Sequence, residues 1–251
     1  MKLTVLGCGP ATVGGKKAGS GYLIDNGTHE IVLDLGYGAH KNLQKATDFT
    51  KLTSLFFSHL HPDHCYDLGA FLDQKMSFIS NGLLEEKTQV NIFGPEGVKE
   101  FYSGIIDVFP SLKNIQFKVT VSEMNHSEIK LLDFKAKSKP LKHGVTTLAY
   151  RIESSGKTIV YSADTEYCQE IVDLGAGADL LILECSVPED RRMSGHLTPA
   201  DCARIAVESN PKKLLLTHFF PYNDEEKAKQ IVEEKFKGEV LIAKDLMEIE
   251  V

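Results

Sequence analysis

The densest group of reactive side chains in this sequence is a stretch of seven residues with three histidines and one aspartate. It reads Ser58-His59-Leu60-His61-Pro62-Asp63-His64, an H-x-H-x-D-H pattern directly after the apolar run 53–57. Alternate side chains of an extended strand end point the same way, so His59 and His61 can bind one metal ion together. Asp63 and His64 follow where the chain turns into a helix, and they can face a second ion. Imidazole and carboxylate ligands without thiolate are typical of catalytic zinc sites, and manganese or iron are alternatives.

A second strand ends in the same way. Thr217-His218 follows the apolar run 214–216, just as Ser58-His59 follows 53–57. This echo suggests that two similar halves meet at one site. The competing interpretation of the histidine-rich stretch is a hydrogen-bonded core cluster or a solvated turn, although histidines are rarely so dense without a metal.

These residues need strands and helices to position them. Apolar, β-rich runs bounded by turn residues predict strands at 2–6, 21–24, 31–35, 53–57, 115–121, 146–152, 158–161 and 180–183. We expect helices over 66–80, after Pro95, after the Thr198-Pro199 cap, and from Asn223, where Glu226 completes a capping-box pattern. Strands and helices are mixed throughout without a linker. The sequence therefore predicts a single α/β (α+β) domain, residues 1–251, of stacked layers.

Composition narrows the class of protein. The 251 residues include 28 Lys+Arg and 35 Asp+Glu, which gives a formal net charge of −7. Hydrophobic residues make up 42% and charged residues 25%, which excludes a disordered or fibrous chain. No apolar run approaches the roughly 18 residues of a membrane span, so we expect no membrane partner.

The five cysteines are scattered and never form a C-x-x-C pair, which favours reduced thiols and a cytoplasmic location. Val5-Leu6-Gly7-Cys8 looks like a lipoprotein cleavage box, but the apolar stretch before it is too short for a signal peptide.

These motifs, in this order, resemble the metallo-β-lactamase-fold hydrolases, and among them the ribonuclease Z-like phosphodiesterase branch. The resemblance covers nearly the whole chain, including the Gly-rich loop after the first strand and the strand end at Asp34. It implies a four-layer αββα sandwich and two divalent metal ions, zinc in preference to manganese or iron. The implied ligands are His59, His61 and His143 for one ion, Asp63, His64 and His218 for the other, and Asp164 as a bridge.

Three of these assignments have alternatives. His143 precedes the strand 146–152, as the third motif of the family requires, whereas the competing His126 lies among polar residues. Asp164 ends an apolar strand, where a carboxylate is presented rigidly, but it could instead cap a helix. His218 could be an ordinary core histidine.

Two further residues separate this branch from its relatives. His196, in Gly195-His196-Leu197-Thr198, matches a family histidine that binds no metal, and Glu184 matches the glutamate that hydrogen-bonds it. Taken alone, Glu184 could be a buried acid paired with Arg191 or Arg192, and His196 a surface loop residue.

The chemistry that follows is metal-assisted hydrolysis. Two divalent ions lower the pKa of a shared water, and the resulting hydroxide can attack phosphorus. We expect Asp63 to orient that water, His196 to protonate the leaving alkoxide as general acid, and Glu184 to favour the charged form of His196. Because a carboxylic ester hydrolase needs no such cationic acid, His196 favours phosphodiester hydrolysis.

The spacing of the later motifs bears on substrate size. Ribonuclease Z carries a long arm between its third and fourth motifs that grips tRNA, but here Asp164 follows His143 by only 21 residues. With a net charge of −7 and no basic run, we expect a small phosphodiester, such as a cyclic nucleotide or a cyclic sugar phosphate, rather than a large RNA.

Other functions stay open on the sequence alone. They are an RNA 3′-processing nuclease that lacks the arm, a hydrolase of carboxylic esters, lactones or thioesters, and a non-catalytic metal-binding module. A homodimer is expected only from the family. The Gly-rich loop 7–15, together with Ser20, could border a bound phosphate or be a permissive turn.

Overall fold

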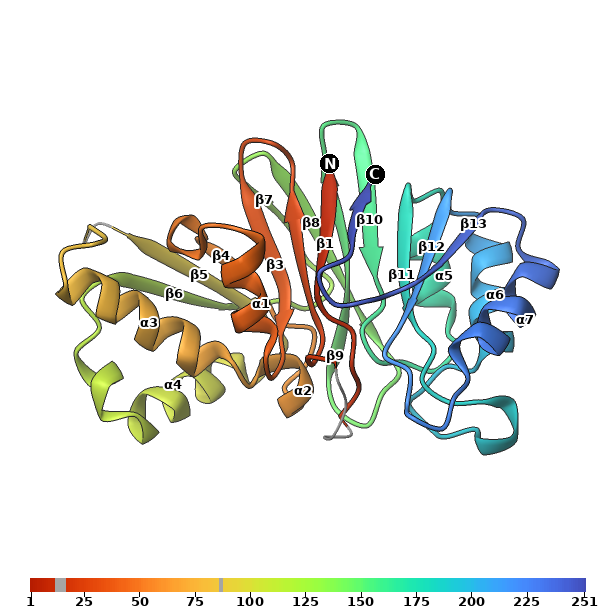
Figure 1. Ribbon diagram of the computed structural model, residues 1–251, viewed down its shortest axis with the longest axis horizontal. Coiled ribbons are helices and arrows are strands. Elements are labelled where there is room, and N and C mark those ends of the chain that lie inside the picture. Colours follow the sequence, from red (N-terminus) through yellow and green to blue (C-terminus); the bar gives the residue numbers. More distant parts are fainter. Residues whose placement is uncertain (12–16, 86–87) are drawn as a thin grey trace.

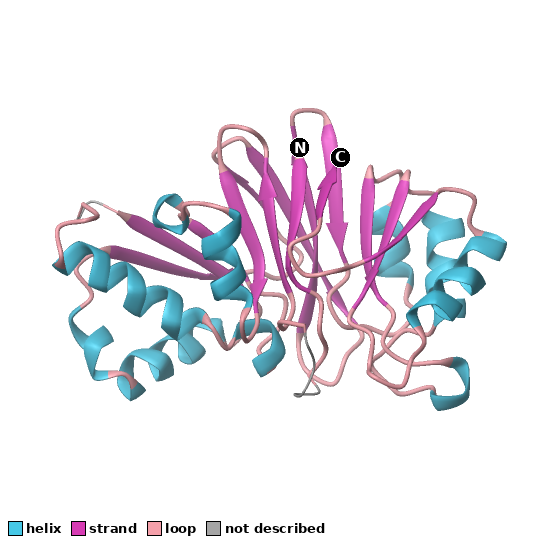
Figure 2. Ribbon diagram, viewed as in Figure 1, coloured by secondary structure: helices cyan, strands magenta, loops and turns pink. Residues whose placement is uncertain are grey.

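The structure is a computed structural model that describes residues 1–11, 17–85 and 88–251, and within them two seven-stranded sheets stand in the middle of the molecule. Helices cover the outer faces of these two sheets, as Figure 2 shows. The predicted α/β class and the four-layer αββα arrangement are therefore confirmed.

The first sheet joins the two ends of the chain. Its order is β14-β1-β2-β3-β4-β5-β6. The strands span Glu248–Glu250 (β14), Lys2–Gly7 (β1), Gly21–Asp25 (β2), Glu30–Leu35 (β3), Ser54–Phe56 (β4), Gln89–Gly94 (β5) and Lys118–Glu123 (β6). Because β1 pairs with β14, the chain ends marked in Figure 1 lie close together. Strands β3 to β6 run parallel.

The second sheet has the order β13-β12-β11-β10-β9-β8-β7. Its strands span Glu239–Ile242 (β13), Lys213–Thr217 (β12), Leu180–Glu184 (β11), Lys157–Tyr161 (β10), Thr147–Ser154 (β9), Phe134–Leu141 (β8) and Glu128–Leu131 (β7). Strands β10, β11 and β12 are parallel, and β9 is antiparallel to β10. The segments after β10, β11 and β12 and the segment before β9 therefore meet at one edge, which is the lower edge in Figure 1.

The helices divide between the two sheets. Beside the first sheet lie α1 (Ala39–Ala46), α2 (Pro62–Cys65), α3 (Leu68–Ser80) and α4 (Val98–Val108), and beside the second lie α5 (Gln169–Gly175), α6 (Pro199–Ser209) and α7 (Glu225–Lys235). Short 3₁₀ turns occupy Phe49–Lys51, Pro110–Asn114 and Glu189–Arg191.

Buried apolar side chains hold the layers together. The cluster between the sheets includes Tyr22, Phe56, Tyr150, Tyr161 and Leu215. Hydroxyl groups also connect the two sheets through this apolar layer: Tyr150 donates to the carbonyl of Phe57 at 2.8 Å, and the hydroxyls of Tyr22 and Thr217 lie 2.8 Å apart. Such bonds satisfy polar groups in the core, so the sheets are held at one relative position.

The N-terminal cap expected for α6 is confirmed, whereas the cap of α7 lies one residue after the expected position. Thr198 caps α6 in a full capping box with Asp201, as expected. The cap of α7 is Asp224, which accepts from the amide of Lys227, and not Asn223. The Asn223 amide instead donates to the carbonyl of Cys185, so tertiary contact moved the cap by one residue.

The predicted helix 66–80 begins two residues late, and a separate helical turn precedes it. The chain makes the single turn α2 over Pro62–Cys65 and begins α3 only at Leu68. The amide of Asp67 donates to the carbonyl of Leu35, a contact with the first sheet that a continuous helix would not make. This break lets the metal-motif segment turn beside the sheet edge.

All five cysteines are free and buried among the residues that the structure describes. Cys8, in the lipoprotein-like stretch, lies within hydrogen-bonding distance of the Ala243 carbonyl and the Asp245 carboxylate. Within the described residues 1–11, 17–85 and 88–251, no helix has the length and apolar character that crossing a membrane requires.

The hydrogen bond from Tyr150 to the Phe57 carbonyl, which joins the two sheets, can be tested by Tyr150→Phe. Loss of the hydroxyl leaves the buried Phe57 carbonyl without this donor, and we expect the free energy of unfolding to fall by about 1–2 kcal/mol. Urea unfolding measures this loss. Tyr167→Phe is the control, because the Tyr167 hydroxyl bonds the exposed Glu208 and its loss should change stability by under about 0.5 kcal/mol. Equal losses in the two variants would contradict the role of Tyr150.

Candidate metal centre

Six histidines and two aspartates converge at the lower edge of the two sheets. One group, His59, His61, His143 and Asp164, has potential ligand atoms all within 4.8 Å of one another. A second group meets the same criterion, and its members are Asp63, His64 and His218. A third, overlapping group contains Asp164, His196 and His218. The structure thus brings together every residue that the sequence assigned to the metals, from α2, the segments after β4, β10 and β12, and the segment before β9.

In the first group, three imidazole nitrogens face one another. Nε2 of His59 lies 3.0 Å from Nδ1 of His61, and Nε2 of His143 lies 3.3 Å from that same nitrogen. Both His59 and its neighbour Ser58 are fully buried at the end of β4. The three nitrogens therefore point at a common position.

The second group is equally compact. Oδ2 of Asp63 lies 3.1 Å from Nε2 of His218 and 3.6 Å from Nε2 of His64. The two imidazole nitrogens are 3.4 Å apart. His218 has a φ of +61°, and its amide donates to the carbonyl of Cys8, so contact with the segment after β1 fixes its turn out of β12.

Asp164 lies between the groups and directs one oxygen at each. Its Oδ1 is 3.4 Å from Nε2 of His64 and 3.5 Å from Nε2 of His218. Its Oδ2 is 3.9 Å from Nε2 of His59 and 4.0 Å from Nε2 of His143. This is the placement that a carboxylate bridging two cations requires, and Asp164 caps no helix in the structure.

For three of these histidines, His64, His143 and His218, the outer nitrogen Nδ1 has a hydrogen-bond partner that favours one tautomer. Nδ1 of His143 donates to the carbonyl of Gly195 at 2.8 Å, and Nδ1 of His64 lies 2.7 Å from Oδ2 of Asp34. Nδ1 of His218 lies 2.9 Å from the hydroxyl oxygen of Ser186. Since Nδ1 carries the proton in each case, Nε2 is left with a lone pair directed into the cluster.

Asp34 is the residue for which sequence reasoning found no role. Its buried carboxylate accepts from the amide and hydroxyl of Ser58 and from the hydroxyl of Tyr161, and it also binds His64. The sequence signal was present, because Asp34 is an acid near the end of an otherwise apolar strand. What it binds depends on segments about 24 to 127 residues away.

The donor set fits divalent cations. Imidazole nitrogens only 3.0–3.4 Å apart repel one another when both present lone pairs, and a cation between them removes that repulsion. Oδ1 of Asp164 is buried and lacks a hydrogen-bond partner among the described residues, as expected for an oxygen that awaits a metal.

Electrostatics agree with this fit. Burial, together with the nearby His64, holds the pKa of His59 well below its usual value, and neutral imidazole is the form that binds metal. Burial opposes protonation of His64, yet the carboxylates of Asp164 and Asp34 hold its pKa well above the ordinary value. The cluster therefore attracts positive charge, which a metal ion can provide in place of a proton.

His196 and Glu184 form a pair beside the cluster. Nδ1 of His196 lies 3.1 Å from Oε1 of Glu184 and 4.0 Å from Oδ2 of Asp164. Burial opposes its protonation, but the hydrogen bond and charge of Glu184 outweigh this and raise the pKa of His196 to about 9. Glu184 is itself buried, and it accepts from the amide of Thr165 and the hydroxyl of Ser186.

The alternatives for this pair are wrong. Arg192 binds Asp201 and Glu189, and Arg191 lies over the ring of Tyr222, so neither is the partner of Glu184. The His196 side chain is only 11% exposed, so it is no surface loop residue.

The remaining histidines lie elsewhere. His126 is exposed, His29 pairs with Asp133, and His40 lies in an aromatic cluster with Phe49. Residues 12–15 of the predicted phosphate loop 7–15 lie outside the described residues. Ser20 is buried.

Comparison with known proteins identifies the family. A model of the beta-lactamase superfamily domain matches residues 22–219. The chain belongs to the beta-lactamase superfamily. The probable metallo-hydrolase YhfI of Bacillus subtilis (strain 168) is 30% identical to the present chain over 248 residues, with 97% of each chain covered. Its crystal structure superposes with a TM-score of 0.87 at 28% identity, over 100% of this chain and 99% of that one.

Two other comparisons widen the picture of the superfamily. Ribonuclease Z from Porphyromonas gingivalis (strain W83) is 26% identical, covering 86% of this chain and 87% of its own. Zinc-bound PqqB from Methylobacterium extorquens has the same fold, with a TM-score of 0.76 at 13% identity over the full length of both chains. The protein is thus a metal-dependent hydrolase of the metallo-β-lactamase fold, related to ribonuclease Z.

The choice of His143 over His126 can be tested by metal binding. After stripping with a chelator, zinc added at about 100 times its Kd should raise the Tm of the wild type by about 5–10 °C, because binding to the native state alone adds stability. We expect the same rise for His126→Ala and a clearly smaller one for His143→Ala. Differential scanning calorimetry measures both, and the reverse pattern would refute the assignment of His143.

Asp34→Asn tests the support of His64. An amide cannot orient the imidazole as the carboxylate does, and we expect zinc affinity to fall by about 10–100-fold. Competition with a chromophoric chelator gives the affinity. Asp179→Asn is the matched control, because this mostly buried acid binds Lys212 far from the cluster. Unchanged affinity in Asp34→Asn would show that His64 needs no such support.

Proposed function

We propose that the protein is a dinuclear metal-dependent phosphodiesterase that acts on a small phosphodiester. The observation that supports this most strongly is the buried His196–Glu184 pair beside Asp164. A carboxylate-supported imidazole close to the metal cluster is placed to act on a reacting group there. Hydrolysis of a carboxylic ester, lactone or thioester has less need of such a cation.

The proposed ligands are those that the geometry groups together. His59, His61 and His143 would hold one ion, and Asp63, His64 and His218 the other, with Asp164 shared. Zinc is the proposed metal, consistent with the imidazole-rich donor set and with zinc in the PqqB structure, and manganese or iron are alternatives. When bound, such ions lower the pKa of water and neutralise charge on phosphoryl oxygens.

His196 is proposed to protonate the leaving oxygen. Its Nδ1 is bound to Glu184, so Nε2 is the atom that can deliver a proton. The pKa of about 9 in this setting keeps the ring charged at neutral pH, and a positive charge close to phosphoryl oxygens also favours their binding. Glu184 acts through His196 and is therefore a positioning residue.

Asp63 is proposed to orient the attacking water. Its Oδ2 faces His218 and His64, so Oδ1 is the oxygen available to accept a water proton. The side chain is buried at the first turn of α2, which restricts its motion. This arrangement suits alignment of a nucleophile.

The region between His143 and Asp164 supports a small substrate. Strands β9 and β10 are joined by the two residues Ser155 and Gly156, both with positive φ, as in a tight hairpin. A turn of this kind contains no RNA-gripping arm. The similarity to ribonuclease Z keeps an RNA 3′-processing activity as the second candidate.

The acid role of His196 predicts a dependence on the leaving group. For a methyl or ribose leaving oxygen, which needs a proton, His196→Ala should lower kcat by about 10²–10⁴-fold. For 4-nitrophenolate, which leaves without one, the loss should be much smaller. Steady-state hydrolysis of matched diesters measures this contrast, and His126→Ala serves as the control.

The same assays separate the alternatives. A thioester and a lactone are tested beside the diesters, together with a short precursor tRNA. Activity on the carboxylic esters alone would overturn the proposal, as would equal losses in His196→Ala for both diester leaving groups. Cleavage of the tRNA with no small-diester activity would favour the nuclease.

A further inference from the structure

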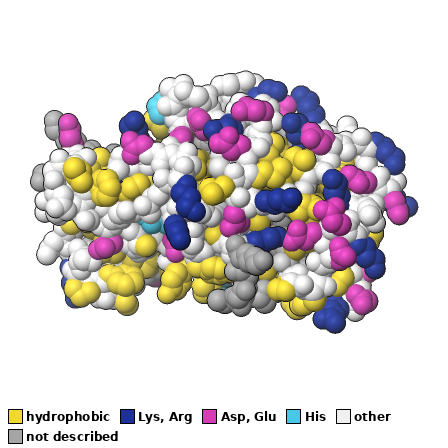
Figure 3. All heavy atoms as spheres, viewed as in Figure 1, with side chains coloured by type: hydrophobic (Ala, Val, Ile, Leu, Met, Phe, Trp, Pro, Cys, Tyr) yellow, Lys and Arg dark blue, Asp and Glu magenta, His cyan; other side chains and the backbone are white. Residues whose placement is uncertain are grey.

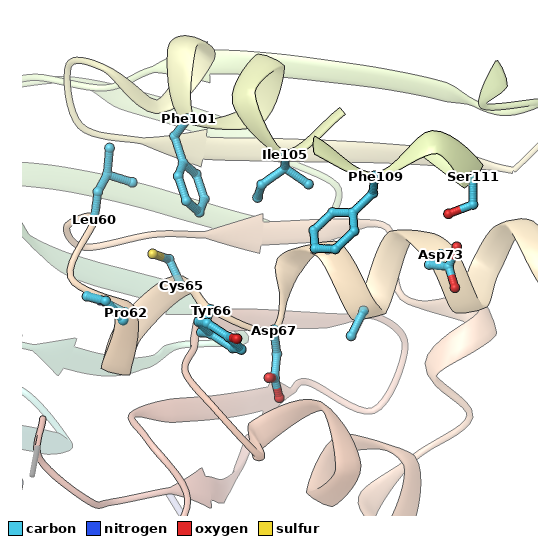
Figure 4. Close-up of a pocket in the computed structure, with 12 residues that line it drawn as sticks. Leu60, Pro62, Cys65, Tyr66, Asp67, Asp73, Phe101, Ile105, Phe109 and Ser111 are labelled. Carbon is cyan, nitrogen blue, oxygen red and sulfur yellow. The ribbon is translucent and has the colours of Figure 1, made fainter. Parts of the chain in front are cut away.

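An apolar pocket of about 470 Å³ opens between α2, α3 and α4. In Figure 4 the side chains of Phe101, Ile105 and Phe109 extend from α4 and its C-terminal end toward Leu60 and the α2 turn. A volume of this size suits a small molecule or one substituent of it.

The pocket shares its wall with the metal cluster. Leu60 and Pro62 line it and flank His61 in the chain, and Cys65 lines it directly after His64. The turn that presents two histidines to the cluster thus presents apolar side chains to the pocket. The pocket and the cluster are therefore neighbours along this turn.

Exposed apolar side chains surround the same edge of the molecule. Four of them lie within four residues of a cluster histidine: Tyr66 (69% exposed), Met193 (44%), Tyr222 (42%) and Val145 (41%). Phe109, at the pocket itself, is 47% exposed. Figure 3 shows hydrophobic side chains along this lower edge. Burial of such surface is favourable, so the edge suits an apolar ligand.

We infer that the pocket binds an uncharged, apolar ester group of the substrate, so that the preferred phosphodiester carries an alkyl chain. This inference rests on the proposed function. Asp67 and Asp73 also line the pocket, and their carboxylates disfavour a second anionic group there, which leaves the phosphate at the metal cluster. A lasting protein partner on these side chains would cover the edge where the cluster lies, which favours the substrate as the occupant.

The test is a series of 4-nitrophenyl phosphodiesters whose second ester is methyl, butyl or octyl. The leaving group is constant, so differences report binding of the alkyl chain. For each methylene that the wild type buries, we expect KM to fall by up to about fourfold, with little change in kcat.

Phe109→Ser should abolish most of this chain-length dependence while hydrolysis of the methyl ester stays as in the wild type. Val207→Ser is the control, because Val207 is similarly exposed (53%) but lies on α6, away from the pocket. We expect Val207→Ser to retain the full dependence.

Binding without turnover separates this inference from the proposed function. Isothermal titration with methyl phosphate and octyl phosphate should show tighter binding of the octyl compound by the wild type and by Val207→Ser, but not by Phe109→Ser. If no diester is hydrolysed and this pattern holds, the proposed function fails and the pocket assignment stands. Equal binding of the two phosphates, or a dimer that dissociates on Phe109→Ser with no chain-length effect, would overturn the assignment.

Discussion

The carboxylate of Asp34 is the contact on which the site depends most. It is buried, near the end of β3, and its partners come from three directions: Ser58 after β4, His64 in α2 and Tyr161 in the opposite sheet. A buried charge is tolerated only when it is fully hydrogen-bonded, and here each bond also positions a segment of the centre. The orientation of the His64 imidazole therefore depends, through Asp34, on how the two sheets are placed against each other.

The same logic extends across the cluster. For His64, His143 and His218, the partner of the outer nitrogen sets the direction of the nitrogen that faces the cluster. The outer partner of His218 is also linked to the candidate acid. Ser186 donates to Glu184 and accepts from His218, while Glu184 binds His196. The candidate acid and the second metal group are thus two ends of one hydrogen-bond network. Such networks act as units, because disturbing one member shifts the others.

Under the proposed function, substrate selection depends on where charged and apolar side chains lie around the cluster. The chain is acidic overall, so under the proposed function its attraction for a phosphate would be local and would come from the cluster and His196. Around that point exposed apolar side chains gather, and the pocket beside α4 is lined by carboxylates and, among the described residues, by no cation. One position for an anion and one for an apolar group together describe an amphiphilic small molecule better than a polyanion.

Part of the centre was predictable because four candidate ligands lie within residues 59–64, whereas His143, Asp164 and His218 were assigned through the family resemblance. The H-x-H-x-D-H pattern after a buried strand predicts a metal site without knowledge of the fold, and the strand ends at Asp164 and His218 follow from apolar runs. The helix break before α3, the cap at Asp224 and the role of Asp34 were not predictable. Each depends on a contact with a residue distant in sequence, such as Leu35 or Tyr161, and no local periodicity encodes such a partner. Local pattern thus set which residues could bind metal. Packing of the two sheets set the hydrogen-bond partners of the histidines and the position of Asp164 between the two groups, because those require atoms from separate strands to meet.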